Sequence, residues 1–196
     1  MKGGMAAVQV TKIDDPYSGY KVTQRIGVDS QSVSYIIDAM QNVVEPKGRL
    51  APEKTALFRI YLYLPGTFFV TPTVISECSL IPDTKRRELH DSFFTVFFAE
   101  VIVENQNTVD HRAMELTRLH RGENDCRILA EAEHGNLDTL LTYDTEMISH
   151  LADVSLTTRL ARPTEVWATL GVPKGAKPDK VPHSTNPLGR EAWWKW

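Results

Sequence analysis

Apolar residues in this chain form short uninterrupted runs that alternate with stripes spaced three and four residues apart. The short runs predict buried strands, and they cover residues 25–29, 67–70, 140–144 and 155–158. The spaced stripes predict amphipathic helices, and they cover residues 33–40, 52–64, 83–97, 100–122, 124–134 and 147–151. The second strand is expected to run on through Pro72 to residue 77. Because strands and helices alternate, we predict an α/β fold, a three-layer α/β/α sandwich around a mainly parallel sheet.

The two ends of the chain differ in character from its middle. Residues 1–22 are small and polar, and we interpret them as a leader before a domain that spans residues 23–170. Residues 171–196 hold four prolines and three glycines and end in a tryptophan-rich segment, which is typical of a tail. Exposed tryptophans can stack on bases or anchor in a partner's groove. We expect this tail to dock on its own domain or on a neighbouring chain.

Composition excludes several classes of protein. The 196 residues are 42% apolar and 24% charged, which is typical of a globular protein and not of a disordered one. The formal net charge of −3 provides no broad basic surface for coating nucleic acid or an anionic membrane. No apolar run reaches the roughly 18 residues of a membrane span. The two cysteines form no CxxC pair, so we expect a cytoplasmic protein.

Four acidic residues stand at positions that favour a shared site. Asp29 and Asp144 each follow an apolar strand run, and ligands of parallel sheets bind beyond the carboxyl ends of the strands. Asp125 begins a helix, and Glu77 follows the segment that starts at residue 67. Four clustered carboxylates repel one another unless cations hold them, and Mg²⁺ or Mn²⁺ prefers such oxygen ligands. A site of this kind activates water and stabilises charge on a phosphoryl group.

Each of these acids also has a purely structural interpretation. Asp29, Asp125 and Asp144 are suited to cap helix N-termini or to face the helix dipole. Glu77 is suited to a solvated helix face. Taken singly, the structural role is the commoner one, and only the joint pattern favours a metal site.

Four segments resemble, in order, the motifs of PIN domains, which are metal-dependent nucleases that include the VapC-type toxins of bacterial toxin–antitoxin pairs. The first is the strand and turn of residues 26–33, with Ser30 and Gln31 where the family has Thr and Asn, and the second is Ser76-Glu77. The third and more specific motif is Asn-Asp followed by a helix with small residues, at 123–132. The fourth is a strand into Thr-x-Asp-x-Glu at 140–146. The resemblance spans roughly residues 25–170 and includes a proline turn at 160–165.

The resemblance implies a function and a set of site residues. The catalytic and metal-binding acids would be Asp29, Glu77, Asp125 and Asp144, with Mg²⁺ or Mn²⁺ as the cofactor. Ser30 or Thr142 would orient a ligand, and Glu146 would be a peripheral acid. The implied reaction is hydrolysis of a phosphodiester bond, in RNA rather than DNA. The resemblance further implies a toxin role with an antitoxin protein as partner, and we expect a homodimer.

Two alternative hypotheses for the function are considered. A PIN-like module that binds nucleic acid or protein without cutting is the first alternative. The second is a phosphoacceptor receiver-like domain, but that needs a second acid beside Asp29 and a late lysine after a strand, which the sequence lacks. A phosphate-cradling GxxxxGK[ST] loop and a GxGxxG motif are absent from the sequence, which weighs against nucleotide enzymes.

Other basic, aromatic and histidine residues are explained by structural roles. The basic run Lys85-Arg86-Arg87 is suited to phosphate contacts or to a solvated helix face. The aromatic residues from Phe93 to Phe98 favour a core or a dimer face. His111, His120 and His134 show no metal-ligand spacing, so we expect exposed or capping roles for them.

Overall fold

The computed structural model describes residues 24–43, 45–183 and 185–196, and its centre is a parallel sheet of five strands. The predicted leader at 1–22 lies outside the described residues. The strand order is β3-β2-β1-β4-β5, and every neighbouring pair is parallel. The strands are β1 (Ile26–Val28), β2 (Phe68–Val70), β3 (Phe98–Glu100), β4 (Thr139–Leu141) and β5 (Arg159–Ala161).

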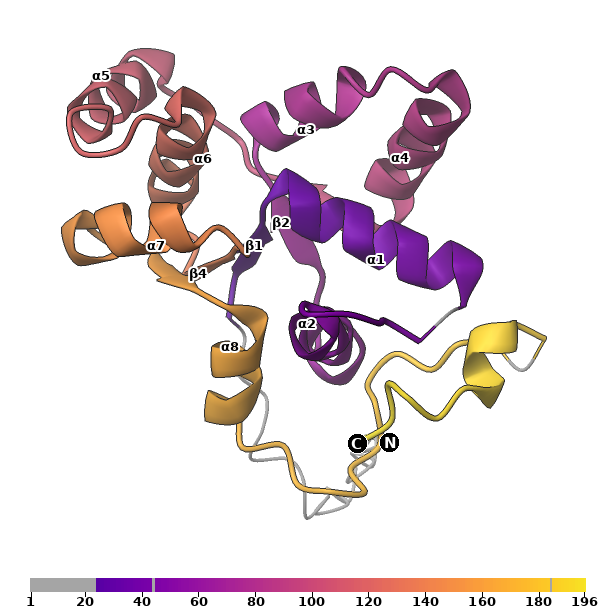
Figure 1. Ribbon diagram of the computed structural model, residues 1–196. Coiled ribbons are helices and arrows are strands. Elements are labelled where there is room, and N and C mark those ends of the chain that lie inside the picture. The colour runs from indigo at the N-terminus through magenta and orange to yellow at the C-terminus, as the bar shows by residue number, and fades with distance from the viewer. Residues whose placement is uncertain (1–23, 44, 184) are drawn as a thin grey trace, which may run out of the picture.

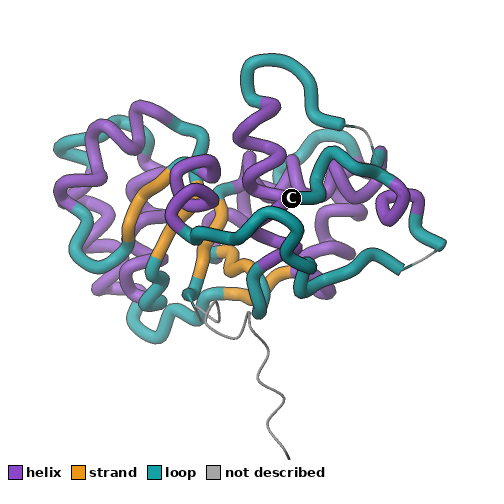
Figure 2. The backbone as a smooth tube through the Cα atoms, turned by 90° about the horizontal axis from the view of Figure 1, so that it is seen from below, coloured by secondary structure: helices purple, strands orange, loops and turns teal. Residues whose placement is uncertain are grey.

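Helices cover both faces of this sheet, so the predicted three-layer α/β/α sandwich is confirmed. In Figure 1, α5, α6 and α7 lie on one side of the strands and α1, α2, α3 and α4 on the other, and Figure 2 shows the strands between the two groups of helices. The helices are α1 (Ser30–Asn42), α2 (Ala51–Tyr63), α3 (Pro72–Ser79), α4 (Thr84–Phe97), α5 (Gln106–Leu116), α6 (Glu123–His134), α7 (Thr145–Leu151) and α8 (Pro163–Thr169). In the part of the chain that the structure describes, short 3₁₀ helices cover Ala152–Val154 and Pro187–Arg190. None of the described helices is long and apolar enough to cross a bilayer.

The strand order places β1 at the point where the chain reverses direction across the sheet. The chain steps from β1 to β2 and β3 on one side and then crosses to β4 and β5 on the other. The carboxyl ends of β1 and β4 are therefore neighbours, and such a reversal point is where open α/β sheets bind ligands. β1 and β4 are buried along their whole length, so they form a rigid support for the residues that follow them.

Three local predictions were wrong, for different physical reasons. Residues 71–77 do not extend β2, because the Thr71 hydroxyl caps α3 and Pro72 occupies the first helical turn, where its missing N–H costs nothing. The helix predicted over 100–122 is shorter and starts only at Gln106, after the edge strand β3. The strand predicted at 155–158 is a turn, in which the Ser155 hydroxyl donates to the Thr158 carbonyl, and β5 begins one residue later.

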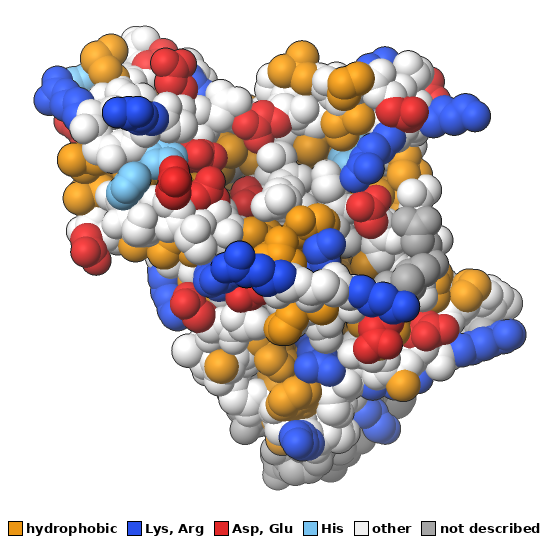
Figure 3. All heavy atoms as spheres, in the orientation of Figure 1, with side chains coloured by type: hydrophobic (Ala, Val, Ile, Leu, Met, Phe, Trp, Pro, Cys, Tyr) orange, Lys and Arg blue, Asp and Glu red, His pale blue; other side chains and the backbone are white. Residues whose placement is uncertain are grey.

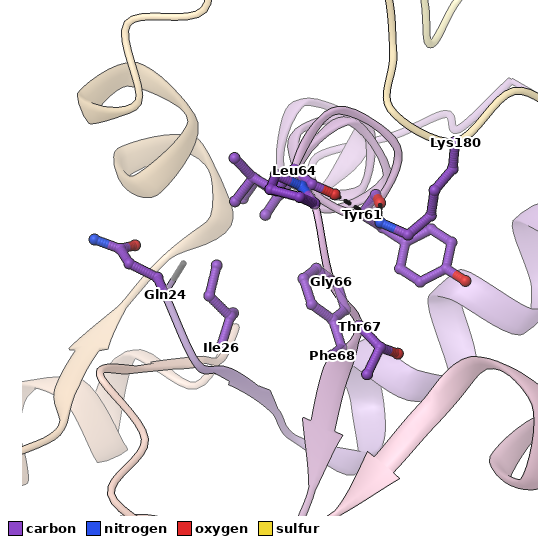
Figure 4. Close-up of a pocket in the computed structure, with 10 residues that line it drawn as sticks. Gln24, Ile26, Tyr61, Leu64, Gly66, Thr67, Phe68 and Lys180 are labelled. Carbon is purple, nitrogen blue, oxygen red and sulfur yellow. Dashed lines mark hydrogen bonds between the residues drawn. The ribbon is translucent and has the colours of Figure 1, made fainter. Parts of the chain in front are cut away.

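The C-terminal tail docks on α2 of its own chain. The Arg59 guanidinium donates to the backbone carbonyls of Trp193, Trp194 and Lys195 at 3.0–3.2 Å, and the indole of Trp194 is buried. Further back in the tail, the Lys180 ammonium donates to the carbonyls of Tyr61 and Leu64 at the C-terminal end of α2 (Figure 4), where the last carbonyls of a helix have no partner within the helix. The adjoining cavity, of about 10 Å³, lies at the amino ends of β1 and β2 and has room for about one water molecule. Its size and contacts indicate a structural role.

Candidate functional site

An open cleft of about 540 Å³ lies where α6 and α7 begin, beyond the carboxyl end of β4. Two of the four sequence-predicted acids, Asp125 and Asp144, line it together. Acidic and histidine side chains gather on this part of the surface, beside the hollow in the middle of the face shown in Figure 3. The remaining lining residues are Leu119, His120, Arg121, Gly122, Glu146 and His150.

Asp29 and Asp144 both cap helices, as the structural interpretation of the sequence predicted. The Asp29 Oδ1 atom accepts a hydrogen bond from the Ser32 amide at 2.6 Å and so begins α1. The Asp144 Oδ1 atom accepts from the amides of Glu146 and Met147 at 2.7 and 2.9 Å and so begins α7. Each cap uses the Oδ1 atom. The Oδ2 atom of Asp144 takes no part in its cap.

Burial in the folded protein changes the pKa of the Asp29 carboxyl group. Removal from water raises the pKa of this group above its ordinary value, and hydrogen bonds from Ser32 and Thr142 oppose the rise. The Thr142 hydroxyl also accepts from the Asp144 amide at 3.0 Å, so one buried threonine contacts both strand-end acids. A carboxylate that is poorly solvated is stabilised by a proton or by a nearby cation.

Glu77 lies beside the cleft and contacts the segment that carries Asp125. Its Oε1 atom accepts a hydrogen bond from the Asn124 side-chain amide at 2.7 Å, which joins α3 to the start of α6. The pKa of the buried Cys78 thiol is raised to about 12. Burial is the largest cause, followed by the negative charges of Glu77, Asp91 and Asp29. Glu77 is not among the residues that line the cleft itself.

Asp125 stands in the first turn of α6 and does not cap it. The N-cap residue of α6 is Gly122, and the Asp125 Oδ2 atom instead lies 2.9 Å from Nε2 of His120. His120 is buried, and its Nδ1 atom lies 3.2 Å from Nδ1 of His150 on α7. The sequence prediction of an exposed or capping His120 was wrong. No pattern in the sequence signals this contact, because it depends on the close approach of the backbone at Gly122.

The donors of the cleft match an open cation site better than a closed one. Within residues 24–43, 45–183 and 185–196, no three His, Cys, Asp or Glu side chains are close enough to hold a metal ion as a group. The structure brings Asp125 and Asp144 into one cleft, whereas Asp29 and Glu77 are not among the residues that line it. Mg²⁺ is commonly held by one or two carboxylates, with waters and substrate phosphates as its other ligands. Two carboxylates with hard oxygen donors fit that pattern, and the four-acid ligand set stays a prediction.

Comparison with known proteins provides no independent assignment, because no protein-family model matches the chain and no curated protein matches it. The likeness to PIN domains therefore rests on the four sequence motifs alone. What the structure adds is the position of their acids at the carboxyl edge of a parallel sheet.

Proposed function

We propose that this protein is a Mg²⁺- or Mn²⁺-dependent nuclease of PIN type that hydrolyses phosphodiester bonds in RNA. One observation carries the proposal: Asp125 and Asp144, which come from segments 19 residues apart with β4 between them, line the same open cleft at the reversal point of the sheet. Asp29 ends the neighbouring strand, and its burial favours a cation close to it.

The residues of the cleft suit the binding of a phosphodiester. Asp125 and Asp144, which line the cleft, would supply oxygen ligands to the cation, and Asp29 and Glu77 would complete the acidic set that the motif resemblance implies. A bound divalent cation lowers the pKa of its water and neutralises charge on the phosphate. Glu146 adds a third carboxylate to the lining, so the cleft repels a phosphate until a cation is present. Arg121, which is exposed at the rim, is placed to contact a phosphate of the substrate.

The proposal extends to a cytoplasmic location, an antitoxin partner and a homodimer. A cytoplasmic toxin role with an antitoxin partner rests on the motif resemblance. For the homodimer, an exposed apolar surface around α3 and α4 is the supporting observation. Leu80, which follows α3, and Val96 on α4 are 76% and 71% exposed, and Phe93, Phe94 and Phe97 on α4 are half-buried.

A second candidate is a PIN-like module that binds RNA or protein without cutting. The observation in its favour is that Asp29 and Asp144 have capping roles and that Asp125 is already bonded to His120. Such a module would keep the fold and the caps without needing a cation.

Cleavage of a fluorescent single-stranded RNA in Mg²⁺ or Mn²⁺ separates the two candidates. We expect the wild-type protein to cut the RNA and Asp125→Asn or Asp144→Asn to reduce the rate by at least about 100-fold, since each removes one anionic ligand. Asp153→Asn, an exposed acid outside the cleft, is the matched control and keeps the wild-type rate. RNA binding without cleavage in the wild type, in either metal, supports the second candidate and overturns the first.

A further inference from the structure

His120 is buried at the back of the cleft and is held on both ring nitrogens. Only 5% of its side chain is exposed. Its Nε2 atom lies 2.9 Å from Oδ2 of Asp125, and its Nδ1 atom lies 3.2 Å from Nδ1 of His150. The three side chains thus form a chain of contacts from α6 to α7, and all three line the cleft.

The chemistry of the pair fixes the direction of its hydrogen bond. An ionised carboxylate only accepts hydrogen bonds, so the Nε2–H group of His120 donates to Asp125. In the neutral ring, the Nδ1 atom of His120 is then an acceptor, and it receives the Nδ1–H of His150. The Oδ2 atom of Asp125 is occupied by this bond. The Oδ1 atom makes no hydrogen bond with any described residue, so it is the one left for a ligand.

The backbone at Gly122 is shaped around the same pair. A Cβ atom added at this position would overlap the Oδ2 atom of Asp125 and lie 2.6 Å from Nε2 of His120. Gly122 itself has φ −73°, which alanine also adopts, so its backbone conformation does not demand glycine. A side chain at this position would therefore have to displace the hydrogen-bonded pair. The Cys126 thiol adds a further contact of 3.5 Å to the His120 carbonyl.

We propose that His120 is a positioning residue that holds the Asp125 carboxylate in place for a divalent cation, with His150 holding the ring of His120 in turn. This inference rests on the proposed function. A carboxylate already fixed by a hydrogen bond loses little rotational freedom when it binds a cation. Replacing a residue that orients a metal ligand in this way typically weakens metal affinity by about 10- to 100-fold.

The test is the affinity for Mn²⁺, measured by calorimetry without RNA. We expect His120→Leu, which removes the donor, to weaken Mn²⁺ binding by about 10- to 100-fold. His120→Gln, which retains a donor near the Nε2 position, recovers part of the affinity. Gly122→Ala weakens binding without changing any ionisable group, because its methyl group displaces the pair. His111→Leu is the control at an exposed histidine outside the cleft, and it binds Mn²⁺ as the wild type does.

Two measurements separate this inference from the proposed function. Equal Mn²⁺ affinity in wild type, His120→Leu and Gly122→Ala overturns the positioning role and leaves the nuclease untouched. Weaker Mn²⁺ binding in both variants, without RNA cleavage by the wild type, supports the positioning role and overturns the nuclease. Absence of Mn²⁺ binding by the wild type overturns both. Should His120→Leu not fold, as judged by circular dichroism, Gly122→Ala and the exposed His150→Leu decide the matter by the same criterion.

Discussion

The backbone amide of Asp29 donates a hydrogen bond to the carbonyl oxygen of Leu141 at 3.2 Å. This bond continues the pairing of β1 with β4 by one residue beyond the end of β1. Asp144 follows Leu141 by three residues and begins α7. The parallel pairing of two buried strands therefore sets the relative positions of the two acids that end them.

Replacement of Asp29 by Asn is expected to stabilise the protein at neutral pH. Burial raises the pKa of this carboxyl group in the folded state, so keeping it ionised costs stability at any pH above its unfolded-state pKa. Asparagine removes the charge and still accepts from the Ser32 amide as an N-cap. Thermal unfolding in metal-free buffer should show a higher Tm for Asp29→Asn at pH 7. The gain should disappear as the pH falls below 3.8, the ordinary value for Asp, where the group is protonated in both states.

The control for this variant is Asp144→Asn, because Asp144 makes a similar cap but is exposed. Its Tm at pH 7 should not rise above that of the wild type, because the exposed carboxylate of Asp144 is not buried as that of Asp29 is. A lower Tm for Asp29→Asn than for the wild type at pH 7 would contradict the stated cost of burial.

The sequence predicted those elements whose residues carry a complete local pattern. Strand β1 and helix α1 are confirmed, because an apolar run, a capping acid and a helical stripe follow one another without interruption. Strand β3 was not predicted, because α4 passes directly into it at Phe98 without a glycine, a proline or a polar break. Local pattern alone does not distinguish the last turn of a helix from a short strand when both are rich in phenylalanine.

The candidate site was predictable to the extent that its acids end strands. Asp29 and Asp144 follow β1 and β4, so their approach at the reversal point could be argued from topology. The bond of His120 to Asp125 needed coordinates, because it depends on the close approach of the backbone at Gly122. The docking of the tail likewise depends on contacts between Arg59 and residues more than 130 positions away, and no local pattern encodes those.

Glu131 on α6 is expected to hold α3 in position beside the site. Its buried carboxylate accepts from the Thr73 amide at 3.0 Å and from the Thr73 hydroxyl at 2.8 Å. Glu131→Ala leaves both donors without a partner, so the free energy of unfolding in urea should fall by about 1–3 kcal/mol. Glu123→Ala, at an exposed position on the same helix, should change it by less than about 0.5 kcal/mol. Equal stability of the two variants would show that the Glu131 contacts do not hold α3.

Arg59 is expected to keep the C-terminal tail on α2. Its guanidinium donates to three backbone carbonyls of the tail and lies 4.8 Å from the centre of the Trp196 ring. Arg59→Met retains the apolar stem and loses the charged donors, which should cost about 1.5–3 kcal/mol of unfolding free energy. Trypsin should then cleave the tail at Lys174 and Arg190 faster than in the wild type.

The control is Arg118→Met, at an exposed arginine far from Arg59 and from the tail in the sequence. It should leave both the free energy of unfolding and the trypsin cleavage of the tail unchanged. Unaltered cleavage of the tail in Arg59→Met would mean that the packing of the tryptophans alone holds it.

The central claim is that the cleft between α6 and α7 holds a divalent cation through Asp125 and Asp144. The most direct measurement is the number and affinity of bound Mn²⁺ ions, followed by electron paramagnetic resonance in the wild type and in the double variant Asp125→Asn, Asp144→Asn. We predict at least one bound Mn²⁺ in the wild type, and its loss in the double variant while the circular dichroism spectrum is retained. Binding of the same number of Mn²⁺ ions with the same affinity by both proteins would contradict the account.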